Sequence, residues 1–390
     1  MRILHVVRGL TNSSGTTHIV GPLAEEQARL GHAVSVYFVE KGAEPPVTPD
    51  ADLVESACFP VTAFGGHPGL SLPLVRQLDA TVGTFDVVHV HAVWNFATYA
   101  AMRAAERAGV PTIVAPQGSL EPWALAAGSW RRRFYARHLE RPLIDRASRL
   151  QALTAAEEAQ FRAYGLSAPA AVIPNGVRPG WLATPRRSLA ADFGLPPGAR
   201  TLVSLSRLHP KKGLDILIRG FALLARDAPG VTLVIAGGDC GSGYGDALRG
   251  LACDLSVADS CRFLGEVGGE EKRRVLAGGD AFALISHSEG LPVAVLEAMA
   301  AGLPVVVTPG CNLPEVESAE AGLVVAADPA AVAVALARLF SDPERMRVQG
   351  GNARRLVAER FTWPAIAETT IAVYRQMIAE ASWREGWRAA

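Results

Sequence analysis

Two carboxylates interrupt an otherwise apolar stretch, "SHSEGLPVAVLEAMAAG" at 286–302. Glu289 directly follows a predicted strand, and Glu297 lies in the helix that comes next. A helix N-terminus offers free N–H groups and a positive dipole end, which together favour a phosphate. Two hydroxyl acceptors beside an anion site suit a sugar nucleotide. The alternative is that both residues only stabilise the helix start, by about 0.3 to 1 kcal/mol each.

A basic stretch, "LSRLHPKKG" at 205–213, follows another predicted strand. Arg207 and Lys212 lie on its loop, where a guanidinium fork and an ammonium group can neutralise a diphosphate. Either residue alone is also compatible with ordinary surface charge. The two stretches together favour a ligand that carries both phosphate and hydroxyl groups.

Two histidines, His89 and His91, share one face of the predicted strand "DVVHVH". A metal pair is conceivable there, but no third ligand is apparent from the sequence. We therefore expect no metal ion, and we interpret His89 as a packed or hydrogen-bonded core residue.

The composition is that of an ordinary globular protein. The 390 residues include 38 basic and 38 acidic side chains, so no net charge drives the chain onto nucleic acid. Five scattered cysteines without a C-x-x-C spacing argue against a disulfide framework or a zinc site and favour reduced, intracellular thiols. No signal peptide and no membrane-spanning segment is apparent, which indicates a cytoplasmic protein.

Short apolar runs alternate with amphipathic helical segments along the chain. This rhythm predicts a parallel α/β fold. The helix "GLDILIRGFALLARDAPG" is one example of the intervening segments. The expected strands are 2–7, 33–39, 86–91, 111–116, 201–206, 231–237, 262–265, 281–286 and 304–308.

The pattern occurs twice, which predicts two doubly wound domains that face a cleft. A connection rich in Pro, Asn and Gly at 171–180 separates the two sets of strands. Ligands of such sheets bind beyond the carboxyl ends of the strands, which is where Glu289 lies. Pro292 is expected in the first turn of the following helix, which ends at Gly302.

Several motifs in the right order resemble the retaining glycosyltransferases of family 4, which have the two-domain GT-B fold. They are "EGLPVAVLEAMAAG", "SRLHPKKG", "FLGEV" (263–267), "VIPNGV" (172–177) and "ARLGHAVSVY" (28–37). The similarity covers nearly the whole chain, and the combination is far more specific than any one element. It implies an acceptor-binding domain at 1–178, completed by a helix at about 370–390 that crosses back, and a donor-binding domain at 179–369. Closure about 176–180 would assemble the site.

The resemblance implies a role for each residue of the donor site. Glu289 would accept a hydrogen bond from a sugar hydroxyl beside the reacting centre, and Glu297 would hold the ribose hydroxyls. Arg207 and Lys212 would stabilise the leaving diphosphate, with help from backbone N–H groups. These N–H groups belong to Gly290, Leu291 and Val293.

The same resemblance extends the site to further positions. The backbone near Leu264 would meet the nucleobase, and His91 would touch the donor sugar. Gly15 would let a loop approach the phosphates, although this chain reads "SSGTT" where the family commonly has two glycines. "DAD" at 50–52 resembles the acidic tripeptide with which other glycosyltransferases hold a divalent ion. It lies in a Pro-rich stretch away from any strand end, so we attribute it to chance and expect no metal or other cofactor.

The segment "PQGSLEPWALAAGSWRRRFYARHLERPLIDRASRL" at 116–150 resembles acceptor-binding segments of enzymes that build bacterial capsular, lipopolysaccharide and exopolysaccharide chains. Gln117 replaces the arginine of the usual Pro-Arg-Gly motif. The segment predicts contact with an anionic membrane surface or a lipid diphosphate acceptor, at the inner face of the cytoplasmic membrane; a solvated helix face is the alternative. The arginines in question are Arg131, Arg132, Arg133 and Arg137.

We therefore expect transfer of a sugar, with retention, from a nucleotide sugar to an acceptor hydroxyl. A nucleotide-sugar epimerase of related fold is the nearest alternative. "AGGDCGSGYGD" at 236–246 is glycine-rich, as in a nicotinamide-dependent oxidoreductase, but it lacks the G-x-G-x-x-G spacing and is better interpreted as a turn. A noncatalytic sugar-binding protein is a further alternative.

Overall fold

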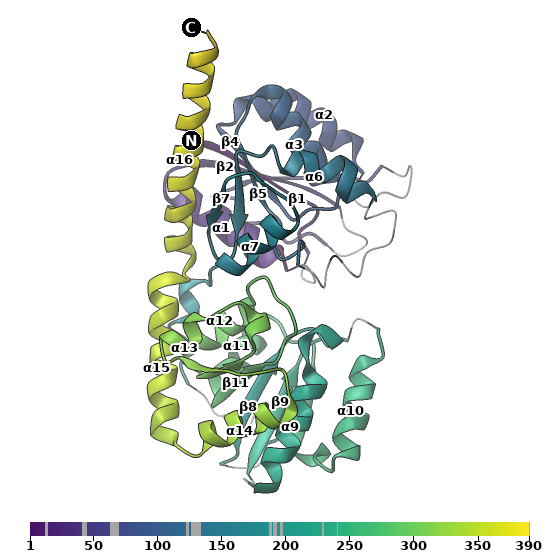
Figure 1. Ribbon diagram of the computed structural model, residues 1–390, viewed down its shortest axis with the longest axis vertical. Helices are drawn as coiled ribbons and strands as arrows, with labels where there is room; N and C mark the ends of the chain where they lie inside the picture. Colours follow the sequence, from purple (N-terminus) through teal and green to yellow (C-terminus); the bar gives the residue numbers. More distant parts are fainter. Residues whose placement is uncertain are drawn as a thin grey trace. The chain divides into compact units, whose positions relative to one another are not determined.

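A computed structural model of the chain divides into two compact units (Figure 1). Unit 1 comprises Met1–Asn175 and Trp363–Ala390, and unit 2 comprises Gly176–Thr362. The sequence had predicted that the first domain would end at 178 and resume at about 370; the units divide at 175 and 363. The structure describes residues 1–11, 15–40, 45–62, 70–121, 125, 134–186, 189, 193–195, 198–227, 230–239 and 241–389, with the backbone alone at 227 and 382–389.

Unit 1 is built on a sheet in which every neighbouring pair of strands is parallel. Its strand order is β3-β2-β1-β4-β5-β6-β7, so the order reverses between β1 and β4. Buried β-branched residues fill β1 and β4, as a sheet covered on both faces requires. The strands are β1 Arg2–Val7, β2 Ala33–Val39, β3 Glu55–Phe59, β4 Val87–His91, β5 Thr112–Ala115, β6 Arg149–Ala152 and β7 Ala170–Val172.

Helices cover both faces of this sheet (Figure 1). Local signals start several of them: Ser71 and Asn95 accept hydrogen bonds from backbone N–H groups in the first turns of α2 and α3. One face packs on α2 and α3, and the other packs on α1 and α16 through residues such as Leu23 and Trp363. The helices are α1 Thr17–Arg29, α2 Leu72–Thr81, α3 Phe96–Ala108, α6 Arg141–Ile144, α7 Ala155–Ala163 and α16 Trp363–Ala389.

Unit 2 repeats the plan with a second all-parallel sheet. Its order is β10-β9-β8-β11-β12-β13, so the reversal falls between β8 and β11. Ligands of doubly wound sheets bind at this switch point, beyond the carboxyl ends of the two strands. The strands are β8 Arg200–Leu205, β9 Val231–Ala236, β10 Cys261–Gly265, β11 Ala281–Leu284, β12 Val305–Val307 and β13 Gly322–Val324.

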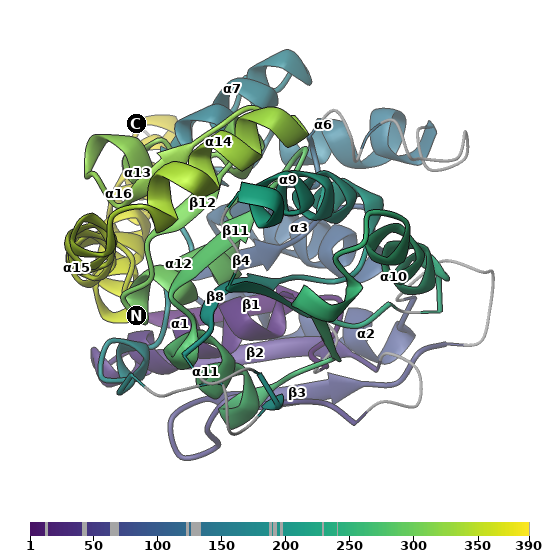
Figure 2. The same ribbon diagram turned by 90° about the horizontal axis from the view of Figure 1, so that it is seen from below.

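The helices of unit 2 pack in two groups on this sheet. Helices α9 and α14 lie side by side on one face, as Figure 2 shows, and share a core with α10. Helix α12 contacts both α11 and α15. The helices are α9 Leu214–Asp227, α10 Tyr244–Asp254, α11 Gly269–Gly278, α12 Val293–Ala300, α13 Glu315–Ser318, α14 Pro329–Phe340 and α15 Pro343–Arg360.

The sequence predicted the central strands well and the peripheral ones poorly. All nine expected strands form, with ends within two residues of the expected ones. Strands β3, β6, β7 and β13 were missed; β7 and β13 have only three residues each, and β3 is half-exposed and lacks a continuous apolar run. Pro292 caps α12 from outside instead of lying in its first turn.

Candidate functional site

Two loops of unit 2 flank the switch point of its sheet, one after β8 and one after β11. Gly213 allows them to approach: it has a φ of 59°, and a Cβ atom there would clash with the carbonyl oxygen of Ile285. The carbonyl oxygen of Lys211 accepts hydrogen bonds from His287 N at 2.8 Å and from Ser286 Oγ at 3.1 Å. The "KKG" sequence thus fixes the first loop against the end of β11.

Glu289 and Lys212 form an ion pair across these two loops. Glu289 Oε1 lies 2.5 Å from Lys212 Nζ, and the side chains are 12% and 14% exposed. Ser286 Oγ donates a second hydrogen bond to the same oxygen, at 2.5 Å. The carboxylate is therefore held by two donors while part of its surface stays open to solvent.

The turn after β12 supports the Glu289 loop from behind. Thr308 Oγ1 donates to the carbonyl oxygen of Ser286 at 2.5 Å, and Asn312 Nδ2 donates to that of Glu289. Gly310 packs so closely under the carbonyl oxygens of 286 and 287 that a Cβ atom would clash with both. Sequence analysis missed these supporting residues because each is polar or small in a way common to many turns.

Glu297 is more buried than its place near the start of α12 suggested. Its Oε2 lies 2.5 Å from Lys272 Nζ on α11, and its side chain is 8% exposed. Burial raises the pKa of the Glu297 carboxyl, and the positive charge of Lys272 opposes this shift. Lys272 and Arg273 also lie over the indole of Trp181, at 5.7 and 5.4 Å from the ring centroid. The sequence had given no sign of a cation for Glu297, because Lys272 lies on a different helix and meets it only through packing.

The other residues of unit 2 that were predicted to bind the donor lie at the same edge of the sheet. Arg207 is exposed two residues beyond β8, and Leu264 is half-buried near the end of β10. The stretch with Gly290 and Leu291 leads into α12, whose first residue is Val293. The structure thus brings every predicted unit 2 residue to the carboxyl edge of one sheet.

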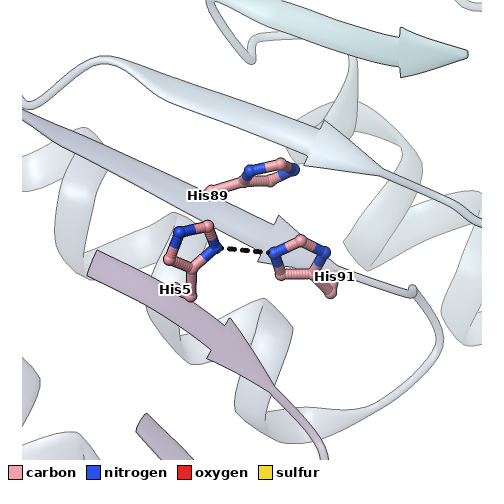
Figure 3. A group of neighbouring side chains, drawn as sticks. All are labelled: His5, His89 and His91. Carbon is pink, nitrogen blue, oxygen red and sulfur yellow. Dashed lines mark hydrogen bonds between the residues drawn. The ribbon is translucent and has the colours of Figure 1, made fainter. Parts of the chain in front are cut away.

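Three buried histidines form a cluster in unit 1 (Figure 3). His5 pairs with His89 in the register of β1 and β4, and His91 lies two residues further along the same face. His5 Nδ1 and His91 Nε2 share a hydrogen bond of 2.9 Å, and the rings of His89 and His91 stack at 4.0 Å. The expectation that His89 lies in the core is confirmed. His5, a third histidine that was not apparent from the sequence, joins the pair through strand register.

The cluster is linked to two helices. His5 Nε2 is 2.7 Å from Gln27 Oε1 on α1, and His89 Nδ1 is 2.6 Å from the Tyr374 hydroxyl on α16. Burial lowers the pKa of His5 to about 4, and burial and neighbouring imidazoles lower the pKa values of the other two. The nitrogens are close enough to hold one metal ion, but four of the six already hydrogen bond to one another or to Gln27 and Tyr374.

Two buried carboxyls lie near the carboxyl edge of the unit 1 sheet. Both oxygens of Glu140 accept from Trp94 N, at 2.7 and 2.8 Å, and burial raises the pKa of this carboxyl to about 8. Glu157 accepts from Gly118 N and Leu153 N, at 2.6 Å each, and burial raises its pKa to about 7. Neither glutamate was predicted, since nothing in the sequence reveals which carboxyls are buried.

The other residues of unit 1 that were predicted from the sequence lie on three separate segments of the chain. Gly15 is exposed, and nothing lies within 4 Å of a Cβ placed there. Gln117 has a φ of 57° and accepts a hydrogen bond from Asn175 Nδ2 at 3.3 Å. Arg137 is exposed, whereas Arg131, Arg132 and Arg133 lie outside the described residues.

Two motifs set aside from the sequence have structural roles. Asp50 of "DAD" accepts from Asp52 N at 3.0 Å within a turn. Asp239, in the glycine-rich stretch, accepts from Gly243 N at 3.0 Å and from Ser242 Oγ just before α10. Both carboxylates therefore close local turns.

Two family matches together span most of the chain. Residues 14–176 match the "Glycosyl transferase 4-like domain", and residues 185–356 match "Glycosyl transferases group 1". The D-inositol 3-phosphate glycosyltransferase of Actinosynnema mirum is 32% identical over 94% of this chain and 93% of that protein. The chain belongs to the family 4 glycosyltransferases. The corresponding protein of Saccharomonospora viridis is 30% identical to this glycosyltransferase over 95% of the chain and 91% of its own length.

Solved structures confirm the GT-B fold of this glycosyltransferase. A sucrose-phosphate synthase from Thermosynechococcus elongatus superposes with a TM-score of 0.76 at 20% identity, covering 97% of this chain and 100% of that one. Anabaena Alr3699/HepE, solved in complex with UDP and glucose, gives a TM-score of 0.76 at 21% identity, with 96% and 100% covered.

Family membership decides between the functions weighed from the sequence. The protein is an enzyme that transfers a sugar from a nucleotide sugar to an acceptor. The epimerase, oxidoreductase and binding-protein alternatives are set aside. No helix in the described part of the chain is both long and apolar enough to cross a membrane.

Proposed function

We propose that this glycosyltransferase uses a nucleoside diphosphate sugar, with UDP as the nucleotide, and transfers the sugar with retention to a hydroxyl of a sugar or polyol acceptor. The observation that carries the proposal is the Glu289 carboxylate, held by Lys212 and Ser286 at the switch point of the unit 2 sheet. UDP in the HepE structure supports the nucleotide. The names of the relatives support a polyol acceptor and a place in bacterial glycoconjugate or polysaccharide synthesis.

Lys212 can serve the carboxylate and the diphosphate together. An ammonium group has three N–H donors, and the contact with Glu289 uses one of them. The remaining donors can meet a phosphate oxygen, and the exposed guanidinium of Arg207 on the same loop can meet another. The leaving diphosphate would thus gain charge stabilisation as the glycosidic bond breaks, and Glu289 would stay oriented toward the sugar hydroxyls.

Glu297 would accept hydrogen bonds from the ribose hydroxyls, with its charge held by Lys272. The backbone near Leu264 would contact the base, and the N–H groups of Gly290, Leu291 and Val293 would contact phosphate. In unit 1, His91 would touch the donor sugar and Gly15 would leave room for the phosphates, as the family resemblance implies. We propose that no metal ion takes part, because Arg207 and Lys212 supply the positive charge that a diphosphate requires.

Unit 1 would bind the acceptor at the carboxyl edge of its sheet, near Gln117 and the exposed Arg137. Attraction of Arg137 and Arg131–Arg133 to anionic lipids would place the enzyme at the cytoplasmic face of a membrane and suit a lipid-linked acceptor. Vesicle flotation with anionic and neutral lipids tests this part separately.

The decisive experiment is a panel of UDP, GDP, ADP and TDP sugars assayed for acceptor-dependent nucleotide release. Inositol 3-phosphate, free inositol and a polyprenyl diphosphate sugar serve as acceptors. We expect release with a UDP sugar and an acceptor, and NMR of the product should show the anomeric configuration of the donor. Preference for another nucleotide, or an inverted product, would contradict the proposal.

A further inference from the structure

The hydrogen bonds of the histidine cluster determine which nitrogen of each ring has the proton. Its three rings are neutral, since burial lowers all three pKa values. A neutral imidazole has one nitrogen that donates and one that accepts. Each hydrogen bond therefore decides which nitrogen of a ring has the proton, and through it the state of the next ring.

Gln27 determines which atoms donate in this series of hydrogen bonds, because its amide has one end that only donates and one that only accepts. Its Nε2 donates to the Tyr374 hydroxyl at 3.4 Å, and its Oε1 lies 2.7 Å from His5 Nε2. A carbonyl oxygen only accepts, so His5 Nε2 has the proton and His5 Nδ1 is an acceptor. His91 Nε2, 2.9 Å from that acceptor, must then be the donor.

This leaves His91 Nδ1 without a proton. The atom is buried and has no hydrogen-bond partner in the described part of the chain. Buried polar atoms of this kind are rare and call for an explanation. His91 is also the last residue of β4, beside the switch point between β1 and β4, where a ligand is expected.

The backbone just beyond His91 supports a ligand at this position. Ala92 and Trp94 have φ values of 64° and 65°, a conformation that residues other than glycine rarely adopt. Such strain collects at functional sites, where the surrounding structure maintains it. Here both oxygens of Glu140 hold the N–H of Trp94.

The same reasoning gives His89 the same tautomer as His91. Tyr374 accepts from Gln27 and is fully buried, so its own proton goes to His89 Nδ1 at 2.6 Å. His89 Nε2 is then the protonated nitrogen, on the side of Gln151. One amide therefore gives His5, His89 and His91 the same tautomer, with the proton on Nε2.

We propose that Gln27 is a positioning residue, which fixes the tautomers of the cluster so that His91 presents an unprotonated Nδ1 to a hydroxyl of the bound sugar. The tautomers follow from the contacts inside unit 1. The hydroxyl contact rests on the proposed function. In such a site a sugar hydroxyl donates, the imidazole stays neutral and no proton transfer is needed.

NMR of the full-length protein labelled with ¹⁵N-histidine tests the tautomers directly. The chain has nine histidines, and His91→Gln identifies the His91 signals by their loss. We expect the wild type to show His91 with the proton on Nε2. A proton on His91 Nδ1, or a stoichiometric zinc ion retained by the purified protein, would overturn the proposal.

Two variants separate the role of Gln27 from general packing. Gln27→Met keeps the length of the side chain but removes the acceptor, so His91 should become a mixture of tautomers. Tyr374→Phe removes the hydroxyl but leaves the Gln27 carbonyl, so His89 should change and His91 should not. The reverse pattern, or an unchanged His91 in Gln27→Met, would refute the assignment.

Kinetics then test the hydroxyl contact. We expect Gln27→Met to lower kcat/KM about tenfold, the scale of one hydrogen bond to substrate, with unchanged affinity for free nucleotide diphosphate. Wild-type kcat/KM in a variant whose tautomers have changed would overturn the hydroxyl contact. If no nucleotide sugar supports transfer by the wild type, the proposed function fails, and the NMR result still decides the role of Gln27.

Discussion

The carboxyl edges of the two sheets hold their polar residues in different ways. In unit 2 the partners are charged, as in the 2.5 Å pairs of Lys212 with Glu289 and of Lys272 with Glu297, and the first pair is partly exposed. In unit 1 three neutral imidazoles are buried and held by directional hydrogen bonds: His5 and His91 bond to each other, and Gln27 and Tyr374 bond to His5 and His89. Exposed charges can exchange partners with an ionic ligand at little cost, whereas a buried neutral network keeps one geometry. The difference suits a diphosphate at one edge and hydroxyl recognition at the other.

Removing the charge of Glu289 should have the largest effect. We expect Glu289→Gln to lower turnover by about a hundredfold or more, on the scale of losing one group that stabilises the transition state. Affinity for free nucleotide diphosphate should be nearly unchanged, because that ligand has no sugar to touch. Steady-state kinetics and calorimetry measure the two quantities.

Glu317→Gln, on the exposed surface of α13, is the matched control. It should behave as wild type. The amide oxygen of glutamine can still accept hydrogen bonds from Lys212 and Ser286, so stability should fall much less than turnover. Wild-type turnover in Glu289→Gln, or a large fall in its melting temperature alone, would count against a role in transfer.

Breaking the second ion pair should affect binding more than chemistry. We expect Glu297→Ala to weaken nucleotide diphosphate binding about tenfold, because the proposed ribose acceptor is lost and one hydrogen bond to a charged group is worth about 1.5 to 3 kcal/mol. Lys272, whose side chain is only 19% exposed, would lose its partner, so stability should fall as well. Calorimetry on the folded variant gives the affinity. An unchanged dissociation constant would remove Glu297 from the ribose site.

Glu140, a buried carboxyl of unit 1, should make the stability of the protein depend on pH. Burial raises the pKa of Glu140 from 4.5 to about 8, so the folded state binds a proton between these values that the unfolded state does not. Its contribution to stability is complete below pH 4.5 and decreases as the pH rises toward 8. Thermal melts of wild type and Glu140→Gln at pH 5 and pH 8 measure this. The variant should lose less stability over the interval, and identical pH profiles would show that Glu140 is not neutral in the fold.

Removal of metal ions should have the smallest effect. Because we propose that Arg207 and Lys212 neutralise the diphosphate, and because His5, His89 and His91 already have hydrogen-bond partners, we expect activity to survive EDTA. Complete loss, restored by Mg²⁺ or Mn²⁺, would contradict metal-independent transfer. Loss restored only by Zn²⁺ would instead indicate that the histidine cluster of unit 1 binds a metal ion.

The sequence was informative where function depends on local order along the chain. The loops after β8 and β11 carry their motifs in consecutive residues, so Arg207, Lys212 and Glu289 were found together. Lys272, Asn312 and His5 were missed, since each meets its partner only through packing or strand register. Burial has the same limitation: nothing in the sequence distinguishes Glu140 from an exposed glutamate.

The discontinuity of unit 1 has a consequence for how the protein is made. Unit 2 is one continuous segment, Gly176–Thr362, and its core can form as soon as that segment has left the ribosome. Unit 1 must wait for α16, because Trp363, Ile371 and Tyr374 fill one face of its sheet. Until then that face of β1 and β4 lacks its cover, and His89 lacks the Tyr374 hydroxyl. The region translated first is therefore among the last to reach its native structure, and during synthesis it offers chaperones an apolar surface.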